Sequence, residues 1–364
     1  MRWVVVGNAE NRRVELFAAA ARAAGQPAPR IVTWQRVLTE GGHTFADDEI
    51  VRLESPGENP AVDARLRGVH EPTRVEGSAR WYTNFLAAVG SLRGGVRLDD
   101  PDELAVLFDK RLCHSRLAAA GVPVPPAPAT GPVRGWSDVK AALREAGMRR
   151  VFVKLAHGSS ASGVLAVEST ASGRWQATTS VEIGADGALH NSLRVRRYRD
   201  ERVIAGIVDR LAPDGLHIER WIPKAALDGR TADLRVVVIG GRATHVVVRT
   251  SRAPLTNLHL GGTRGELAAA RAAAGERWAA ALAVCERAAA CFPGTLCVGV
   301  DLLPGLGWRR FTVGEVNAFG DLLPGLTGLP ATPAEGLDTY AAQLAAAPHF
   351  RTATSRPATI GLLS

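Results

Sequence analysis

Hydrophobic and polar residues follow one repeated order in the N-terminal third of this chain. The apolar run WVVVG is followed by a polar turn and the Ala-rich segment VELFAAAARAAG, and IVTWQRVL repeats the order of strand and then helix. Such alternation is typical of a parallel α/β domain, which binds ligands at the turns after its strands. We therefore predict a parallel α/β domain over residues 1–105, with loops at 41–80 and a helix from Arg80 to Leu92.

The second stretch, residues 106–222, begins with a helical stripe and a linker. Leu107, Leu112 and Leu117 are spaced along one helix that ends near Gly121, and five prolines between residues 122 and 132 predict a linker. A helix is expected at 136–147. The runs VFVKLA, VLAVE, IAGIV and LHIERWI then predict the strands of a small mixed sheet.

Residues 223–346 show longer apolar strands. LRVVVIG and ATHVVVRTS flank a turn at Gly240 and Gly241, an Ala-rich helix is predicted over 265–291, and TLCVGVDLL and RRFTVGEVN predict a second hairpin. The tail, 347–364, is predicted to be weakly ordered. The fold class is therefore α/β (α+β), with boundaries near residues 105, 222 and 346.

Composition restricts the class of protein further. The chain is 46% hydrophobic and 22% charged, and none of its apolar runs approaches the ~20 residues that span a bilayer. The start, MRWVVVGNAENRR, has too short an apolar core for a signal peptide. The four cysteines form no CxxC pair, which favours reduced thiols, and no histidine spacing suggests zinc. We expect a cytoplasmic protein without a membrane segment.

The basic residues are almost all arginines. The net charge is +8, and only Lys110, Lys140, Lys154 and Lys224 are lysines among 44 basic residues. An ammonium is a compact point charge that a guanidinium does not replace, so Lys110, Lys154 and Lys224 are candidate functional groups. Lys140 lies in the polar face of VKAALREAG and is interpreted as a surface residue. The basic charge is scattered, without the cationic runs of a nucleic-acid binder. A phosphate-bearing small ligand explains the charge as well as nucleic acid does.

One lysine precedes a loop of small residues in VFVKLAHGSSASGVLAVE, residues 151–168. Backbone N–H groups in such a loop can approach an anion closely, and the ammonium of Lys154 adds positive charge. The stretch is not a Walker A loop, because GxxxxGK followed by Ser or Thr is absent. Taken alone, this stretch fits an ordinary Gly/Ser hairpin better than an anion-binding loop.

Near the C-terminus, oxygen-bearing side chains share one face of a predicted hairpin. Glu315 and Asn317 are two residues apart on one strand, and a turn at 305–308 would place Asp301 beside Glu315. Burying two carboxylates among Val and Leu requires a compensating cation. Two carboxylates and an amide suit Mg²⁺, whereas Arg309 and Arg310 offer salt bridges as the alternative.

The order of these motifs resembles the ATP-grasp superfamily. The motifs are FDKRL, the strand with Lys154 and its small-residue loop, HIERWIPKA, DLRVVVIGG, VVVRTSRAPLTNLHLGGTRG, GVDLL and GEVN, over roughly residues 100–330. The closest resemblance is to glutathione synthetase and the ribosomal-protein glutamyl ligases. It implies a two-lobed ATP-grasp fold after the parallel pre-domain, and relatives are commonly dimers or tetramers.

The resemblance also implies roles for matching positions. Lys110 and Lys154 would hold the phosphates of ATP. The flap over them would be formed by Gly158, Ser159, Ser160, Ser162 and Gly163. The hinge that binds adenine would contain Glu219, Trp221 and Ile222. Arg235 and Arg249 would face the transferred phosphoryl group, and Asn257 would belong to a closing loop. The ligands of Mg²⁺ would be Asp301, Glu315 and Asn317.

The activity implied is that of an ATP- and Mg²⁺-dependent carboxylate–amine ligase that makes an amide or peptide bond through an acyl-phosphate. Its partners would be a small-molecule or peptide carboxylate and an amine acceptor. Alternatives are an ATP-grasp kinase acting on a hydroxyl and an ATP-binding protein without turnover. Two departures stand out. Lys224 occupies a position where relatives carry an acid for the ribose, for which Asp228 is a candidate substitute, and the residues after Asn317 do not resemble the substrate segment of glutathione synthetase.

For the site of the acceptor substrate, the sequence offers candidate residues only by their position in the chain. Asn8, Asn11 and Arg12 follow the first strand, and Arg80-Trp81-Tyr82 opens a later helix. If these residues line a pocket, Arg12 and Arg80 suit a substrate that carries a carboxylate. They fit ordinary loop and surface positions equally well.

Overall fold

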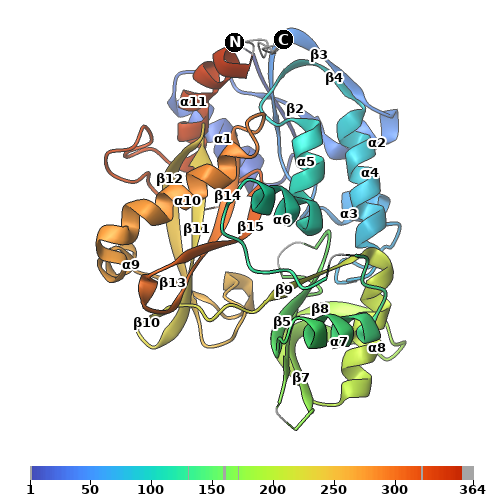
Figure 1. The fold of residues 1–364 in the computed structure, drawn as a ribbon. Helices are drawn as coiled ribbons and strands as arrows, with labels where there is room; N and C mark the ends of the chain where they lie inside the picture. Colours follow the sequence, from blue (N-terminus) through green and yellow to red (C-terminus); the bar gives the residue numbers. More distant parts are fainter. Residues whose placement is uncertain (1, 130, 159–160, 171, 321–322, 355–364) are drawn as a thin grey trace, which may run out of the picture.

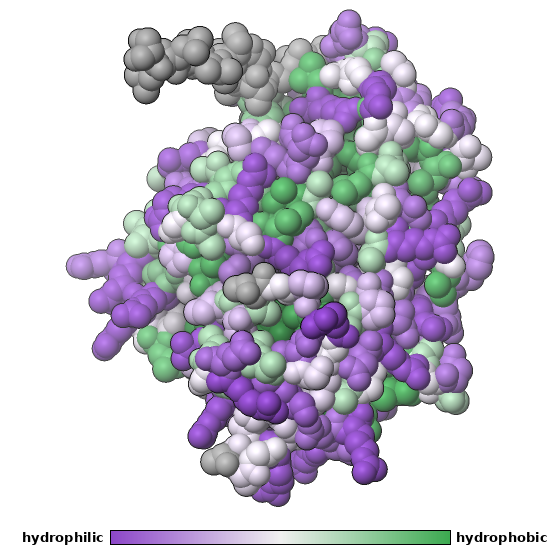
Figure 2. All heavy atoms as spheres, turned by 45° about the vertical axis from the view of Figure 1, so that its right-hand side comes forward, coloured by the Kyte–Doolittle hydropathy of each residue, from purple (hydrophilic) through white to green (hydrophobic). Residues whose placement is uncertain are grey.

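The computed structural model describes residues 2–129, 131–158, 161–170, 172–320 and 323–354. An N-terminal domain (blue), a small lobe (green) and a C-terminal lobe (yellow to red) surround two short central helices (Figure 1). Within the described ranges, no helix is both long enough and apolar enough to cross a membrane. The face in Figure 2 is mostly hydrophilic, with small and scattered apolar patches.

The N-terminal domain is a four-stranded parallel sheet in the order β2-β1-β3-β4, as predicted. Its elements are β1 (Arg2–Gly7), α1 (Arg12–Ala23), β2 (Arg30–Thr33), α2 (Trp34–Glu40), β3 (His43–Leu53), α3 (Pro60–Arg67), α4 (Ser78–Gly90) and β4 (Leu92–Arg97). Val4, Val5 and Val6 are fully buried in β1. The sheet therefore holds the turn after β1 firmly in place.

The prediction of loops over 41–80 was wrong, because β3 and α3 occupy much of that stretch. The first half of β3 is polar and largely exposed, so it lacks the alternation that marks a strand. Helix α3 is only eight residues long and buries Val62 and Leu66 alone. Its start is nevertheless recognisable, since Asn59 caps it and Pro60 is its first residue.

Two short helices, α5 (Pro101–Leu107) and α6 (Lys110–Ala119), connect this domain to the rest of the chain. The carboxylate of Asp109 accepts hydrogen bonds from the backbone N–H groups of Arg111 and Leu112 and so fixes the start of α6. The backbone N–H of Lys110, the first residue of α6, donates to the carbonyl oxygen of Ala156 at 2.9 Å. The start of α6 is thereby tied to the small lobe.

The small lobe is an antiparallel sheet in the order β8-β7-β6-β5-β9, with two helices packed against each other. Its elements are α7 (Trp136–Glu145), β5 (Arg150–Leu155), β6 (Leu165–Ser169), β7 (Trp175–Ile183), β8 (Leu189–Tyr198), α8 (Glu201–Leu211) and β9 (Leu216–Arg220). The run IAGIV is helical and not a strand, because Asp200 caps α8 and Ile204, Ile207, Val208 and Leu211 recur at helical spacing.

The C-terminal lobe is built on an antiparallel sheet in the order β13-β12-β11-β14-β15, with β10 added beside β11. Its strands are β10 (Ala226–Leu227), β11 (Arg230–Ile239), β12 (Arg242–Ser251), β13 (Thr263–Gly265), β14 (Cys297–Pro304) and β15 (Phe311–Ala318). The predicted hairpin through Gly240 and Gly241 is confirmed, and both glycines have positive φ. Tight turns of this kind favour glycine at such angles.

Three helices complete this lobe: α9 (Leu267–Ala274), α10 (Trp278–Ala290) and α11 (Thr339–Thr354). The single helix predicted over 265–291 is in fact two, because the chain bends at Gly275 with φ 54° and ψ −135°. The stretch from residue 347, predicted as a weakly ordered tail, continues α11 as far as Thr354, and α11 packs against α1.

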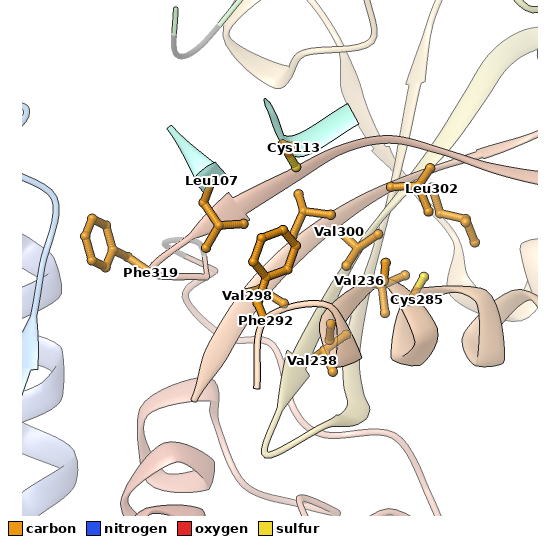
Figure 3. Close-up of a cluster of buried hydrophobic side chains, with 14 of the residues drawn as sticks. Leu107, Cys113, Val236, Val238, Cys285, Phe292, Val298, Val300, Leu302 and Phe319 are labelled. Atoms are coloured by element: carbon orange, nitrogen blue, oxygen red, sulfur yellow. The ribbon is translucent and has the colours of Figure 1, made fainter. Parts of the chain in front are cut away.

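The core of the C-terminal lobe lies between its sheet and α10. Val298, Val300 and Leu302 are alternate residues of β14 that are buried, and Figure 3 shows them beside Val236 of β11 and Cys285 of α10. Since neighbouring side chains of a strand point to opposite faces, the residues between them point away from this core. Asp301 is therefore presented on the other face of the sheet.

Candidate active site

A cavity of about 470 Å³ lies where the three units meet. Most of the predicted site residues line it, drawn from α6, both lobes and the loops between them. These residues are Lys110, Lys154, Gly158, Ser162, Glu219, Ile222, Arg235, Arg249, Asn257, Asp301, Glu315 and Asn317. Cavities of this size commonly hold small ligands and cofactors.

Among the described residues, Gly163 and Trp221 are predicted site residues that do not line the cavity. Ser159 and Ser160 lie outside the described residues. Gly163 is buried with φ +66°, and a Cβ there would lie 2.5 Å from the side chain of Leu155, so close packing requires glycine. Trp221 packs beside Phe152, and its backbone N–H donates to the carbonyl oxygen of Arg150. That N–H is therefore engaged within the protein.

The oxygen-bearing residues come together as the predicted hairpin requires. Asp301 and Glu315 are directly paired residues of β14 and β15, and Asn317 pairs with Gly299. The strand register shifts just after Asp301, and such bulges are frequent beside functional sites. No group of three or more His, Cys, Asp or Glu side chains in the described part of the chain is arranged to hold a metal. A metal here would use the amide oxygen of Asn317 as its third protein ligand.

Two arginines neutralise Asp301. Its carboxylate lies 2.6 Å from Nε of Arg235 and 2.9 Å from Nη2 of Arg249. Burial alone would raise the pKa of Asp301, but the two guanidinium groups outweigh burial and lower it. The alternative partners for these carboxylates, Arg309 and Arg310, do not line the cavity.

The two lysines occupy the other side of the same carboxylates. Nζ of Lys110 lies 2.7 Å from Glu315 and 2.6 Å from the carbonyl oxygen of Gly158. Lys154 forms an ion pair with the buried carboxylate of Glu219. Burial alone would lower the pKa of Lys154, yet the carboxylates of Glu219, Glu315 and Asp301 raise it. Both side chains are mostly buried, at 12% and 13% exposure, so each ammonium is held in a fixed place.

The small-residue loop contacts the C-terminal lobe directly. Val164 packs with Leu255 and Leu260, which belong to the loop that also contains Asn257. This loop turns tightly, since a Cβ on Gly262 would lie 2.7 Å from the carbonyl oxygen of Asn257. Val164, which directly follows the small-residue loop, and Leu255 both line the cavity, so the two segments meet on its wall.

Asp233, which was not among the residues predicted from the sequence, is a buried carboxylate on the cavity wall. It lies 2.7 Å from Nε of Arg249 and 3.2 Å from Nζ of Lys224, and it accepts a hydrogen bond from Thr256. Burial acts to raise the pKa of Asp233, but Arg249 and Lys224 lower it strongly. The position of Asp233 in the sequence DLR could have indicated its place in the site, because it is two residues before Arg235 and therefore lies on the same strand face.

Lys224 belongs to the same cluster of charged residues. Its side chain is 7% exposed, and its ammonium donates to Thr256 at 2.9 Å. Burial lowers the pKa of Lys224 despite the carboxylate of Asp233. Asp228, the suggested substitute for a ribose-binding acid, is exposed in the turn between β10 and β11 and does not line the cavity. Asp233, and not Asp228, is the carboxylate that lines the cavity beside Lys224.

The N-terminal domain contributes a different set of residues from those expected. Trp81 lines the cavity as anticipated, but Arg12 and Arg80 are exposed and do not. Arg13 of α1 and Arg67 of α3 line it instead. Tyr82 stacks on His157 at 3.9 Å between ring centroids, which supports the base of the flap.

The sequence and the structure were compared with those of known proteins. Neither a protein-family model nor a curated protein matches the sequence. The structure is similar to that of the D-cycloserine synthetase DcsG, with a TM-score of 0.56 at 17% identity over 96% of this chain and 99% of that one. It is also similar to the ATP-grasp ligase PsnB complexed with a minimal precursor, with a TM-score of 0.51 at 16% identity over 97% and 98% of the two chains.

A third similar structure is the macrocyclase MdnC bound with precursor peptide MdnA from Microcystis aeruginosa MRC, with a TM-score of 0.50 at 13% identity, covering 94% of this chain and 97% of that one. At these identities the similarity establishes the fold. The finer resemblance to glutathione synthetase stays a prediction. Over nearly its whole length, this chain has the fold of the ATP-grasp ligases.

Proposed function

We propose that this protein is an ATP- and Mg²⁺-dependent ligase that joins a carboxylate to an amine. The observation that carries the proposal is the convergence of Lys110 and Lys154 with the side chains of Asp301, Glu315 and Asn317 on one cavity wall. The similar folds of an ATP-grasp ligase and a synthetase support it. Phosphates need cations and a metal needs oxygen ligands, and this cavity offers both.

The donor set suits Mg²⁺. Asp301, Glu315 and Asn317 would hold the ion through hard oxygen atoms, and Mg²⁺ characteristically keeps phosphate oxygens and water as its other ligands. When bound, the ion would neutralise charge on the phosphates of ATP. Asp301 and Glu315 form ion pairs with Arg235, Arg249 and Lys110. These same cations are the groups that would turn to the triphosphate.

The reaction follows from charge and position. An oxygen of the substrate carboxylate attacks the γ-phosphorus, the bond to the ADP oxygen breaks, and an acyl-phosphate forms. Arg235 and Arg249 would offset the negative charge at the transferred group, while Lys110 and Lys154 would hold the other phosphates. The amine then attacks the acyl carbon, an amide bond forms and phosphate leaves.

The contact between the small-residue loop region and the loop that contains Asn257 has a role in this reaction. An acyl-phosphate is lost to water unless the site is closed, and Val164 packed against Leu255 and Leu260 would exclude water from it. Backbone N–H groups of the flap and the amide of Asn257 would contact the phosphates and the reacting group. Ile222, which follows the hinge residue Trp221, would contribute backbone contacts to adenine.

Trapping with hydroxylamine tests the proposal. The protein is incubated with ATP, Mg²⁺, hydroxylamine and a panel of amino acids and short peptides, and acyl-hydroxamate, ADP and phosphate are measured. A ligase yields hydroxamate that depends on ATP and on one carboxylate of the panel. A phosphorylated product without hydroxamate would indicate a hydroxyl kinase. Salt-sensitive binding of RNA or DNA without ATP turnover would indicate a nucleic-acid binder.

A further inference from the structure

The cavity extends beyond the residues assigned to ATP and the metal. At its N-terminal-domain end it is lined by Arg13, Glu58, Asp63 and Arg67, which come from the start of α1, a loop after β3 and helix α3. None of these four residues belongs to the predicted site. Two positive and two negative side chains at one end of a cavity complement a ligand that carries both signs of charge.

Helix α3 presents one charge of each sign. Nε of Arg67 lies 3.2 Å from the carboxylate of Asp63, one helical turn away, and the two side chains are 16% and 20% exposed. Arg67 also donates to the backbone carbonyl oxygen of Glu76 at 3.3 Å. This second contact restricts the position of the Arg67 side chain, which lines the cavity. Nη2 of Arg67 lies 3.4 Å from the same carboxylate of Asp63, and both contacts with it are long for a charge-assisted hydrogen bond, so a ligand can compete for both groups.

The loop that carries Glu58 is held in an unfavourable backbone conformation. Nδ2 of the buried Asn8 donates to the carbonyl oxygens of Pro56 and Gly57, each at 3.0 Å. Glu58 itself has φ +67°, which is uncommon for a residue with a side chain, and Nδ2 of Asn11 donates to its carboxylate at 3.0 Å. Strain of this kind persists where the surroundings enforce it and is common at ligand sites.

Part of the cavity wall is aromatic. Trp81, Phe108 and Phe319 all line the cavity, with ring centroids 5.9 Å apart for Trp81 and Phe108 and 5.8 Å for Phe108 and Phe319. This apolar wall suits the hydrocarbon stem of a ligand, whereas the ends suit its charged groups. A ligand that spans the cavity would have polar termini and an apolar middle.

We infer that one substrate is a free amino acid, bound as a zwitterion with its α-carboxylate at Arg13 and Arg67 and its α-ammonium at Asp63 and Glu58. This inference rests on the proposed function and names the substrate class for it. An amino acid held by both α groups presents its side chain to Arg235 and Arg249. The reacting carboxylate or amine is therefore on the side chain, and a residue inside a peptide, which lacks the free α groups, does not fit.

The test is isothermal titration of the whole protein with a non-hydrolysable ATP analogue and Mg²⁺ present. The probes are L-glutamate, L-aspartate, L-ornithine and L-lysine, each compared with its N-acetyl and α-amide derivatives and placed within a short peptide. Arg67→Gln and Asp63→Asn are tested beside Arg65→Gln, an exposed position of the same helix. Arg13→Gln is tested beside Arg12→Gln, its exposed neighbour.

At least one free amino acid of the panel is expected to bind, and both blocked derivatives should bind at least tenfold more weakly. Arg13→Gln, Arg67→Gln and Asp63→Asn should each weaken binding by about ten- to a hundredfold, as expected for a lost charge-assisted contact, while both controls stay close to the parent. Equal binding of blocked derivatives, preference for the peptide, or failure of all four amino acids while the analogue binds overturns the inference and leaves the ligase standing. Failure of the analogue itself overturns both.

Discussion

Lys110 and Glu315, which are 205 residues apart in the chain, form an ion pair of 2.7 Å on the wall of the cavity. The same ammonium donates to the carbonyl oxygen of Gly158, at the base of the flap. One lysine therefore connects the start of α6, the strand that carries the proposed metal ligands, and the loop that covers them. This relationship suggests that phosphate binding, metal binding and flap position change together.

Glu315→Gln should retain the fold and lose turnover. The substitution removes one ligand charge without changing side-chain volume, and a metal's stabilisation of transition-state charge amounts to several kcal/mol, so the rate should fall at least about a hundredfold. ADP release and the melting temperature are the two measurements. A variant that melts like the parent and also turns over like the parent would mean that Glu315 has no catalytic role.

Lys154→Arg should weaken ATP binding although the charge is kept. Lys154 is 13% exposed, pairs with Glu219 and lies near the ring of Phe152, so a planar guanidinium does not fit where an ammonium does. We expect at least about a tenfold rise in the dissociation constant of ATP. Lys140→Arg is the matched control, because Lys140 pairs with Glu201 on the surface of the small lobe. Equal losses in both variants would point to a general effect on the lobe.

The cluster around Asp233 predicts unequal effects on stability. Asp233→Asn leaves Lys224 buried without its carboxylate, and removing one partner of a buried pair costs about 3–5 kcal/mol of unfolding free energy. Lys224→Met should cost less, because Arg249 still pairs with Asp233. Urea unfolding of both single variants and the double variant checks this. The double variant should be more stable than Asp233→Asn, and strictly additive losses would show that the two residues are not coupled.

Stability at acid pH should depend on Glu219. Burial acts to raise its pKa, but Lys154 and His217 outweigh burial and lower it from 4.5 to about 2. A carboxyl with a depressed pKa stabilises the fold fully above pH 4.5, and this stabilisation is lost as the pH falls through about 2. The loss should be on the order of 3 kcal/mol. The difference in unfolding free energy between the parent and Glu219→Gln, measured from pH 5 to 2, should shrink steadily; a constant difference would contradict this account.

The strands and helices that were predicted correctly are those with one apolar face and one polar face. Asp301 and Glu315 could be paired because apolar residues alternate with them on both strands and Gly305 marks the turn. Strands β7 and β8 were missed, since β7 buries the polar residues Thr178, Thr179 and Ser180 and β8 carries several arginines, so neither shows a clear alternation of apolar and polar residues. The sequence RWQATTSVEI has few apolar residues to reveal its register.

Which residues line the substrate end of the cavity depends on how each helix is rotated about its axis. Arg12 and Arg13 are adjacent, but about 100° of rotation separates them on α1, and only the packing of α1 on the sheet decides which one faces the cavity. Arg67 and Arg65 differ in the same way on α3. Asp233 was missed because a lone carboxylate in a strand is informative only once Lys224 and Arg249 are known to meet it.

The central claim is that the cavity binds ATP together with a divalent ion held by Asp301, Glu315 and Asn317. Its most direct test is titration of a non-hydrolysable ATP analogue into the parent and into Glu315→Gln, with Mg²⁺ and again with a chelator. The account predicts that Mg²⁺ tightens binding to the parent at least about tenfold and has little effect on Glu315→Gln. Equal affinity of the parent with and without Mg²⁺, or an undiminished Mg²⁺ effect in Glu315→Gln, would contradict it.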